Sequence, residues 1–259
     1  MHKPTLFKER AVRYDNEGKL EMINNLDKVY SEIELWGKVN HAYFVKFYEL
    51  IDAEERHDYL YLILELADLG QLAHWDYKQE LYIRNEAIFE TVKAWLAQNG
   101  LLLPEAEVPV VEQVAKYIFR QLAEALLYLH EEMNMIHRDI KLDNILFSSK
   151  DLRVKLTDFT VARADINDET RLFDSEGTPA FTAPECHIVD EQGYRPKPTD
   201  MWSFGVSLYA YVQRIVPFYA SGGELEMQIN SRTKPLEIPS TFSADLTDLL
   251  SCLLSKDPD

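Results

Sequence analysis

The sequence predicts an α+β protein with two lobes, and three observations carry this prediction. Two largely apolar and aromatic runs, 43–50 and 59–66, read as strands and are separated by a polar turn, which is typical of a β-hairpin. Apolar positions recur at helical spacing over 84–98 and 111–132. A chain of 259 residues with 46% hydrophobic content is also long enough for two lobes rather than one.

Further helices are expected on both sides of these elements. A charged stretch, 1–22, precedes a helix that Asn24 or Asn25 would cap and that would end near Gly37. The segment 199–216 is apolar almost throughout, so we expect a helix buried in the core. Shorter helices are expected near 222–231 and 243–255.

The composition limits the classes of partner and the compartment. A formal net charge of -17 should repel nucleic acid and anionic membranes and favour basic peptides or proteins, although the charge could equally serve only solubility. Cys186 and Cys252 form neither a disulfide framework nor a zinc spacing, which indicates a reducing, cytoplasmic location. We expect no membrane span and no signal peptide, because no apolar run is long enough and Met1 is followed by charged residues.

The residues most suited to chemistry lie in one stretch, 137–144, which reads His-Arg-Asp-Ile-Lys-Leu-Asp-Asn. It runs into an apolar segment, 145–147, and a second predicted strand, 154–156, is followed shortly by Asp158. Acidic, amide and lysine side chains are thus fixed on loops beside short strands. The alternative interpretation is a loop with ordinary hydrogen bonds, but a string of this length favours a functional site.

These residue types suit the transfer of a metal-bound phosphoryl group. Asp139 can accept the proton of an acceptor hydroxyl, and Lys141 can place a compact positive charge beside the transferred phosphate. Asn144 and Asp158 offer the hard oxygen ligands that Mg²⁺ prefers.

The stretch resembles the catalytic loop of the protein kinase family, His-Arg-Asp-x-Lys-x-x-Asn. The resemblance continues through Asp158-Phe159, the run Gly-Thr-Pro-Ala-Phe-Thr-Ala-Pro-Glu at 177–185, and Asp-Met-Trp-Ser-Phe-Gly-Val at 200–206, and it covers 30–259. It implies a two-lobed protein kinase-like fold, ATP and Mg²⁺ as cofactors, and a protein substrate.

By this resemblance, Asp139 is the catalytic base and Lys141 assists at the transferred phosphate. Asn144 and Asp158 are the Mg²⁺ ligands. Lys141 also favours a serine/threonine kinase over a tyrosine kinase.

The resemblance also implies residues that hold the nucleotide. Glu32 matches the helix glutamate that pairs with a phosphate-binding lysine, although it could be a solvated carboxylate like Glu34. The adenine would bond to backbone groups of Glu65 and Ala67, with Leu146 under the ring.

Other motifs of the resemblance concern internal packing. Trp36 should stack in a column with Phe47, Phe159 and His137, and the column should rest on Asp200.

The polar segment 158–185 would be the activation segment of a kinase. Thr178 matches the threonine that contacts the catalytic aspartate and lysine. Thr170 and Ser175 are candidate phosphosites, and Arg138 is available to pair with a phosphate.

Acidic residues flank one of these hydroxyls. Asp174 and Glu176 lie on either side of Ser175 and could supply the negative charge without phosphorylation. An acidic loop exposed to solvent is the alternative.

Within the family, the chain most resembles the calcium/calmodulin-dependent protein kinase kinases and related upstream activators of AMP-activated kinases. The similarity rests on Val29–Ile33, Gly177–Phe181 and Leu236–Pro239. It implies another protein kinase as substrate and a role in calcium or energy signalling. The chain has no basic amphipathic helix typical of calmodulin binding, so calmodulin would act only through segments outside it.

The sequence departs from the family first at the phosphate-binding half. A Gly-x-Gly-x-x-Gly hairpin and a strand lysine should precede Glu32, but the only glycine there is Gly18. Lys3 and Lys8 lie past the position of that lysine, which would fall before Met1. We therefore expect a chain that lacks the first strands.

Two further departures follow. Thr160 stands where the family has glycine, and a β-branched residue resists the backbone angles that glycine permits. The chain stops after Asp259, before the final helices and before the arginine that would pair with Glu185.

We therefore expect an incomplete small lobe at 1–66 and a large lobe at 67–259 that lacks its final helices. The pattern turns helical from about Gly70, and the part at 72–110 is predicted to be an insertion. Its helix either packs on the large lobe or offers a docking face. Two functions remain open: a protein serine/threonine kinase, or a truncated, pseudokinase-like binding or scaffolding module with little turnover.

Overall fold

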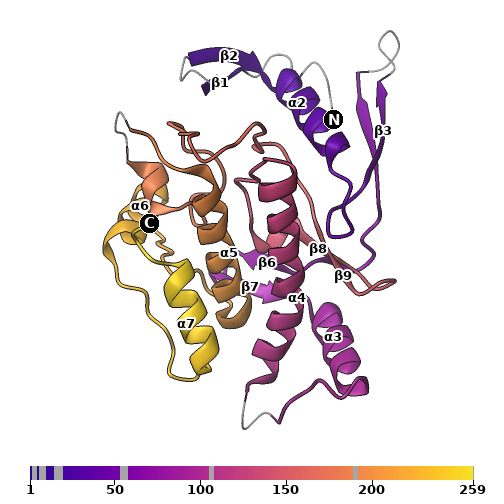
Figure 1. Cartoon of the computed structure of the whole chain (residues 1–259), viewed down its shortest axis with the longest axis vertical. Coiled ribbons are helices and arrows are strands. Elements are labelled where there is room, and N and C mark those ends of the chain that lie inside the picture. Colours follow the sequence, from indigo (N-terminus) through magenta and orange to yellow (C-terminus); the bar gives the residue numbers. More distant parts are fainter. Residues whose placement is uncertain are drawn as a thin grey trace.

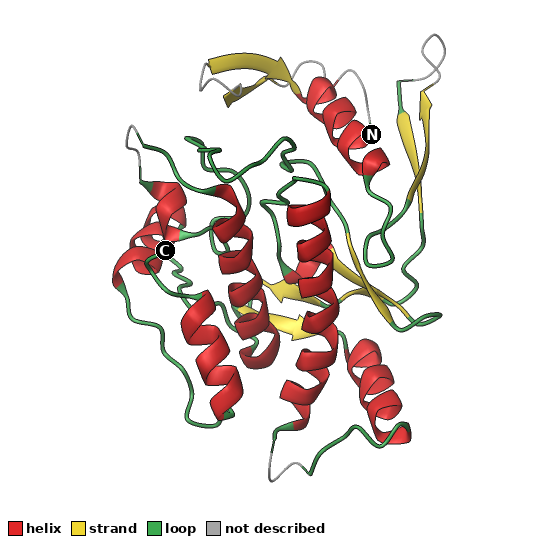
Figure 2. Cartoon of the chain, viewed as in Figure 1, coloured by secondary structure: helices red, strands yellow, loops and turns green. Residues whose placement is uncertain are grey.

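The chain runs from a strand-rich N-terminal part to a helical C-terminal part (Figure 1). This architecture comes from a computed structural model, which describes residues 1, 5, 10–14, 20–52, 58–104, 108–188 and 192–258 and, for 10–14 and 20–23, only the backbone. Figure 2 shows most of the helical ribbon gathered on one side of the molecule, and paired strands beside a helix on the other. The predicted α+β content is therefore confirmed.

The N-terminal part consists of two antiparallel hairpins and a helix. Strand β1 (Arg10–Tyr14) pairs with β2 (Leu20–Asn24), and β3 (Phe47–Asp52) pairs with β4 (Leu60–Leu64). Helix α2 (Asn25–Lys38) connects the two hairpins. The sequence did not predict the first hairpin, and its turn signal at 15–18, Asp-Asn-Glu-Gly, lies outside the described residues.

The predicted start of α2 is confirmed by its capping geometry. The side chain of Asn24 accepts a hydrogen bond from the backbone N–H of Asp27 (2.9 Å), and the carboxylate of Asp27 accepts one from the N–H of Asn24 (3.4 Å). This reciprocal pair satisfies two amide groups that the first turn leaves unpaired. The helix extends one residue beyond the predicted end at Gly37.

The remaining elements are β5 (Gly70–Gln71), β6 (Ala73–Asp76), β7 (Leu81–Arg84), α3 (Glu86–Gln98), α4 (Val110–Leu127), η1 (Tyr128–Glu132), η2 (Leu142–Asn144), β8 (Ile145–Ser148), β9 (Arg153–Leu156), η3 (Pro184–His187), α5 (Pro196–Gln213), α6 (Glu224–Thr233) and α7 (Ala244–Leu253). Strands β5, β8 and β9 form an antiparallel sheet, and β6 pairs with β7. The two parts are joined where the N–H of Val45 donates to the carbonyl of Leu156 (2.9 Å).

Helices α4 and α5 form the centre of the core. Phe119 of α4 packs edge-on against Phe204 of α5, with ring centroids 5.5 Å apart. Almost every position of α5 is buried, as its apolar sequence predicts. The helix ends three residues before the predicted Val216, because Arg214 adopts a left-handed conformation (φ 67°).

The segment that follows Gly70 is not purely helical, so this prediction is wrong. It first forms the hairpin β6–β7 and only then helix α3. Helix α3 packs on α4, where the rings of Trp95 and Tyr117 lie 4.9 Å apart. The structure thus favours packing over docking for this helix. Among the described helices, none combines the length and the apolarity needed to span a bilayer.

Candidate active site

Asp139 lies at the centre of a closed hydrogen-bonded group. Lys141 Nζ donates to Asp139 Oδ2 (2.7 Å) and to Thr178 Oγ1 (2.7 Å), and Thr178 Oγ1 donates to Asp139 Oδ1 (2.6 Å). Asn144 Nδ2 donates to both the carbonyl (2.8 Å) and the carboxylate (2.9 Å) of Asp139. Burial opposes ionisation, but the hydrogen bonds from Lys141 and Thr178 hold the pKa of Asp139 below its ordinary value. The carboxylate is therefore ionised and able to accept a proton.

Gly177 allows the activation segment to approach this group. Its φ is +101°, and a Cβ placed there would lie 2.3 Å from the carbonyl oxygen of Arg138. Only glycine fits both the conformation and the contact. The approach brings the neighbouring Thr178 within reach of Asp139.

Asp200 fixes the other side of the catalytic loop. Its buried carboxylate accepts hydrogen bonds from the backbone N–H groups of His137 (2.8 Å) and Arg138 (2.8 Å) and from His130 Nε2 (2.8 Å). Burial opposes its charge, yet the bond from His130 and the nearby imidazole and amide groups hold the pKa of Asp200 below its ordinary value. The clamp holds Arg138 in a left-handed conformation (φ 69°).

The predicted aromatic column is present. Trp36 lies 6.4 Å from Phe47 and 5.7 Å from Phe159, and Phe159 lies 5.4 Å from the ring of His137. Since the backbone of His137 is bonded to Asp200, the column links helix α2 to helix α5.

Asn144 and Asp158 offer oxygens that fit a magnesium ion. The amide nitrogen of Asn144 faces Asp139, and Thr160 donates through its hydroxyl (2.5 Å) and its N–H (3.2 Å) to Asp158 Oδ1. Within the described part of the chain, Asn144 Oδ1 and Asp158 Oδ2 accept no hydrogen bond. Hard oxygens of this kind suit Mg²⁺, which commonly uses few protein ligands together with phosphate oxygens and water.

Thr160 fits its position without backbone strain. Its φ is not positive, so the conformational freedom of the expected glycine is not used here. The hydroxyl instead orients Asp158.

Glu32, on helix α2, lies near Asp158. Burial and the negative charge of Asp158 raise its pKa to about 7, and hydrogen bonds from Thr160 and Phe159 counteract part of the effect. No lysine or arginine among the described residues forms an ion pair with Glu32. The lysine that would pair with it therefore stays a prediction from the sequence.

The predicted adenine-binding groups have free backbone atoms. The carbonyl of Glu65 and the N–H of Ala67 bond to no other described residue, whereas the N–H of Glu65 donates to the carbonyl of Lys46 (2.8 Å). Leu146 is half-buried on strand β8. The carboxylate of Glu65 pairs with Lys155 Nζ (2.7 Å), a buried contact that sequence reasoning missed.

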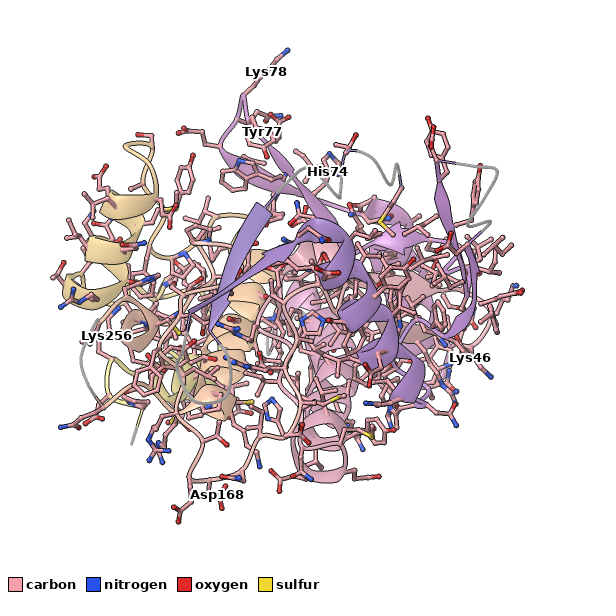
Figure 3. All side chains as sticks on the ribbon, turned by 90° about the horizontal axis from the view of Figure 1, so that it is seen from above. Lys46, His74, Tyr77, Lys78, Asp168 and Lys256 are labelled. Atoms are coloured by element: carbon pink, nitrogen blue, oxygen red, sulfur yellow. The ribbon has the colours of Figure 1, made fainter. Side chains whose placement is uncertain are left out.

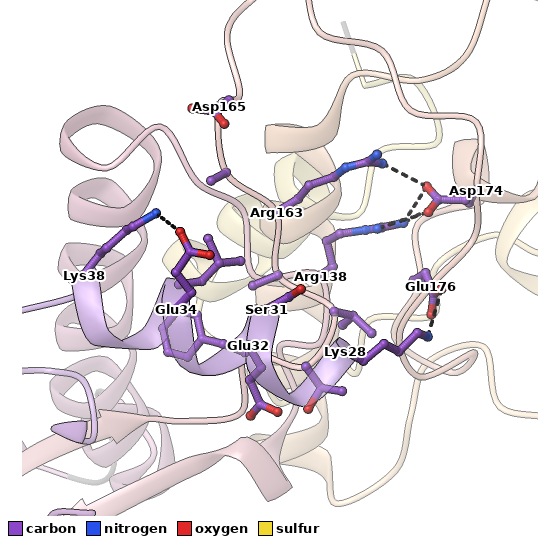
Figure 4. Close-up of a pocket in the computed structure, with 16 residues that line it drawn as sticks. Lys28, Ser31, Glu32, Glu34, Lys38, Arg138, Arg163, Asp165, Asp174 and Glu176 are labelled. Atoms are coloured by element: carbon purple, nitrogen blue, oxygen red, sulfur yellow. Dashed lines mark hydrogen bonds and ion pairs between the residues drawn. The ribbon is translucent and has the colours of Figure 1, made fainter. Parts of the chain in front are cut away.

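Acidic residues of the activation segment pair with a basic cluster (Figure 4). Arg138 donates to Asp174 at 2.8 Å and 3.3 Å, and Arg163 lies 3.8 Å from the same carboxylate. Lys28 of helix α2 lies 3.8 Å from Glu176. These residues line a cavity of about 370 Å³ between α2 and the activation segment.

The two candidate phosphosites do not contact Arg138. Ser175 Oγ lies 3.4 Å from His187 Nδ1, and Thr170 Oγ1 accepts a hydrogen bond from the N–H of Asn167 (2.9 Å). The position beside Arg138 is taken by Asp174 instead.

Comparison with known proteins identifies the family. The sequence profile described as the protein kinase domain matches residues 8–259. The chain belongs to the protein kinase family. Three kinases illustrate the similarity: GRIK2, a serine/threonine-protein kinase of Arabidopsis thaliana (32% identity, covering 90% of this chain and 49% of that one), a probable serine/threonine-protein kinase of Dictyostelium discoideum (32%, 91% and 29%) and the SNF-related serine/threonine-protein kinase of Homo sapiens (30%, 96% and 28%).

This kinase chain spans about half the length of the Arabidopsis relative and less than a third of the other two. All three relatives are serine/threonine-protein kinases by name, in agreement with the type that Lys141 indicates. The narrower resemblance to calcium/calmodulin-dependent kinase kinases is not decided by these similarities.

Two features of the kinase chain differ from sequence reasoning. The sequence predicts Glu185 without its arginine partner, but the structure places the cation Arg195 nearby. Burial raises the pKa of Glu185 above its ordinary value, and the charge of Arg195 counteracts part of this shift. Tyr82, which sequence reasoning missed, donates to Asp143 Oδ2 (2.9 Å). Alternating apolar residues in 73–76 and 81–84, on either side of a polar tetrad, were the available signal for its hairpin.

Proposed function

We propose that the chain is the catalytic part of a protein serine/threonine kinase, which transfers the γ-phosphate of ATP to serine or threonine of protein substrates. The observation that carries this proposal is the buried, ionised Asp139, held by Lys141, Thr178 and Asn144. These three side chains fix the orientation of the carboxylate, which a group that must meet an acceptor hydroxyl requires.

Each residue has a role in this reaction. Asp139 accepts the proton of the acceptor hydroxyl as its oxygen bonds to phosphorus and the bond to ADP breaks. Lys141 stabilises negative charge on the transferred group. Asn144 and Asp158 hold Mg²⁺, which neutralises phosphate charge when it is bound.

The nucleotide site follows from the free backbone groups near the connection between the lobes. Glu65 and Ala67 bind the adenine edge, Leu146 lies under its ring, and Glu32 is the partner that a phosphate-binding lysine would take. We assign 1–66 to an incomplete small lobe and the remainder to a large lobe with an insertion near 72–110.

The activation segment is proposed to be ordered without phosphorylation. The support is the pairing of Asp174 with Arg138, where a phosphate would otherwise supply the charge. Treatment of the purified protein with a phosphatase should leave its activity unchanged. A loss of most activity would refute this part of the proposal.

The substrate is proposed to be another protein kinase, which would place the chain upstream in calcium or energy signalling. The support is the similarity of Val29–Ile33, Gly177–Phe181 and Leu236–Pro239 to upstream activators. Calmodulin would act only through segments outside this chain. A catalytically inactive kinase should accept phosphate faster than a short peptide with the same acceptor sequence, and equal rates would contradict the assignment.

The decisive experiment measures phosphate transfer from labelled ATP to a basic test protein. Asp139→Asn is the matched control, because it keeps the shape of the side chain and removes its charge. We expect transfer by the parent protein and at least a hundredfold less by the variant, on the order of what general-base catalysis contributes.

The second candidate function is a scaffolding module with little turnover, favoured by the absence of a described cation beside Glu32. Equal signals from the parent and the Asp139→Asn variant would overturn the kinase proposal. Binding of Mg-ATP without any transfer would support the scaffold.

A further inference from the structure

The inserted hairpin β6–β7 is attached firmly to the end of helix α5. Arg84 Nη2 donates to the carbonyls of Tyr211 (2.9 Å) and Val212 (3.3 Å), which the helix leaves unpaired at its C-terminus. The N–H of Tyr82 donates to the carbonyl of Arg214 (2.6 Å), and Arg214 Nε donates back to the carbonyl of Tyr82 (3.1 Å).

Its tip extends away from the body of the molecule, where Tyr77 and Lys78 are seen (Figure 3). Tyr77 is 87% exposed. The hairpin is therefore anchored at its base, whereas Tyr77 at its tip is exposed to solvent.

Tyr82 points inward from the root of this hairpin and is only 4% exposed. Its ring packs edge-on against Phe181 (centroids 6.2 Å apart) and against Trp75 (5.2 Å). Its hydroxyl donates to Asp143 Oδ2 (2.9 Å). Burial and the carboxylates of Asp143 and Asp139 raise the pKa of Tyr82, so the hydroxyl stays protonated and remains a donor.

Both contacts of Tyr82 lead to the central group. Asp143 belongs to the turn η2 and immediately precedes Asn144, whose amide holds Asp139. Phe181 donates through its N–H to the carbonyl of Thr178 (2.8 Å), the residue whose hydroxyl bonds to Asp139. One side chain from the insertion thus touches both segments that orient Asp139.

We propose that Tyr82 is a positioning residue for phosphoryl transfer, through which the inserted hairpin fixes the catalytic loop and the activation segment relative to each other. This inference rests on the proposed function. The hydroxyl holds the catalytic loop at Asp143 through its hydrogen bond, and the ring holds the activation segment at Phe181 through its packing. A misplacement of about 1 Å at the acceptor can cost up to a hundredfold in rate, so a brace at this point acts on turnover rather than on nucleotide binding.

The test compares Tyr82→Phe with Tyr77→Phe in the full-length protein. Both variants lose one tyrosine hydroxyl from the same hairpin, but only Tyr82 bonds to the catalytic loop. We expect kcat to fall about tenfold in Tyr82→Phe, with the KM for Mg-ATP unchanged and with no change in the Tyr77→Phe control. The melting temperature should fall by no more than about 6 °C, because one hydrogen bond is lost while the ring and its packing remain.

A double-variant comparison separates positioning from a general structural role. If Tyr82 acts through Asp143, the double variant Tyr82→Phe/Asp143→Asn should be no slower than the slower single variant. Multiplied losses would overturn the proposal, as would an unchanged kcat in Tyr82→Phe.

Hydrogen exchange gives a readout that does not depend on activity. Amides of 139–147 and 177–182 should exchange faster in Tyr82→Phe than in Tyr77→Phe, and equal exchange would overturn the brace itself. Faster exchange with unchanged kcat would overturn the catalytic role. A parent protein that transfers no more phosphate than Asp139→Asn would overturn the proposed function and, with it, the role of Tyr82 in phosphate transfer. Hydrogen exchange would then still report whether Tyr82 stabilises the two segments.

Discussion

Removing the carboxylate of Asp174 should destabilise the protein strongly. In Asp174→Ala, Arg138 loses its hydrogen bonds at 2.8 Å and 3.3 Å, while its side chain is only 7% exposed. Its remaining partners are the hydroxyl of Tyr194 (3.2 Å) and the carbonyl of residue 174 (3.5 Å). The guanidinium would keep its charge without a counter-charge at hydrogen-bond distance.

The magnitude follows from this burial. Removing one partner of a buried ion pair costs about 3–5 kcal/mol, and we expect the lower end because Tyr194 still accepts from Arg138. A chain of this size loses roughly 2–4 °C of melting temperature per kcal/mol. The expected decrease in melting temperature is therefore about 6–12 °C. Phosphate transfer should also fall, because Arg138 directly precedes Asp139.

Thermal unfolding of the purified variants measures this effect. Asp168→Ala is the matched control, since it removes the same charge from an exposed position of the same segment and should shift the melting temperature by no more than about 1 °C. Asp174→Asn should show an intermediate decrease, because it keeps an acceptor but not the charge. Equal melting temperatures for Asp174→Ala and Asp168→Ala would refute the reasoning.

Three further predictions concern the same site. The raised pKa of Glu32, about 7, means that the folded chain binds this proton more tightly than the unfolded chain, so the contribution of Glu32 to stability falls as the pH rises from about 4.5 to 7. Urea denaturation in EDTA should therefore show that Glu32→Gln gains stability relative to the parent between about pH 5.5 and pH 8. The same difference in stability at both pH values would contradict this prediction. Thr160→Gly removes the hydroxyl from Asp158 and adds backbone freedom, so the free energy of unfolding should drop by about 1–2 kcal/mol in urea, and no change would contradict it. Gly177→Ala would place a Cβ 2.3 Å from the carbonyl of Arg138, so phosphate transfer should fall by more than about tenfold, and parent-like kinetics would count against the required close approach.

The local pattern of the sequence was sufficient for the longest elements. The apolar run at 199–216 required a buried helix, and the structure differs only in its ends. A cap at Asn24 or Asn25 was recognisable because a short amide before a helix can satisfy unpaired backbone donors, and the structure assigns this role to Asn24. These features depend on residues within a few positions of one another.

The hairpin β6–β7 was missed because its strands are short. A four-residue alternation is weak evidence beside the strong helical period that begins at Glu86. A negative charge from Asp174 or Glu176 in place of a phosphate was predicted only as one of two alternatives, and the pairing of Asp174 with Arg138 was not predicted, because a sequence does not show whether an acidic loop folds back onto a basic residue.

The local sequence was sufficient to predict the chemistry that is proposed for this protein. The stretch 137–144 and Asp158 indicated a proton acceptor, a cation and metal-binding oxygens, because those residue types at that spacing suit phosphoryl transfer. How these groups are held depends on the folded chain. The family resemblance implied the roles of Thr178 and Asp200, but the contact of Tyr82 with Asp143 was seen only in the structure, because it depends on how the hairpin packs rather than on any local pattern.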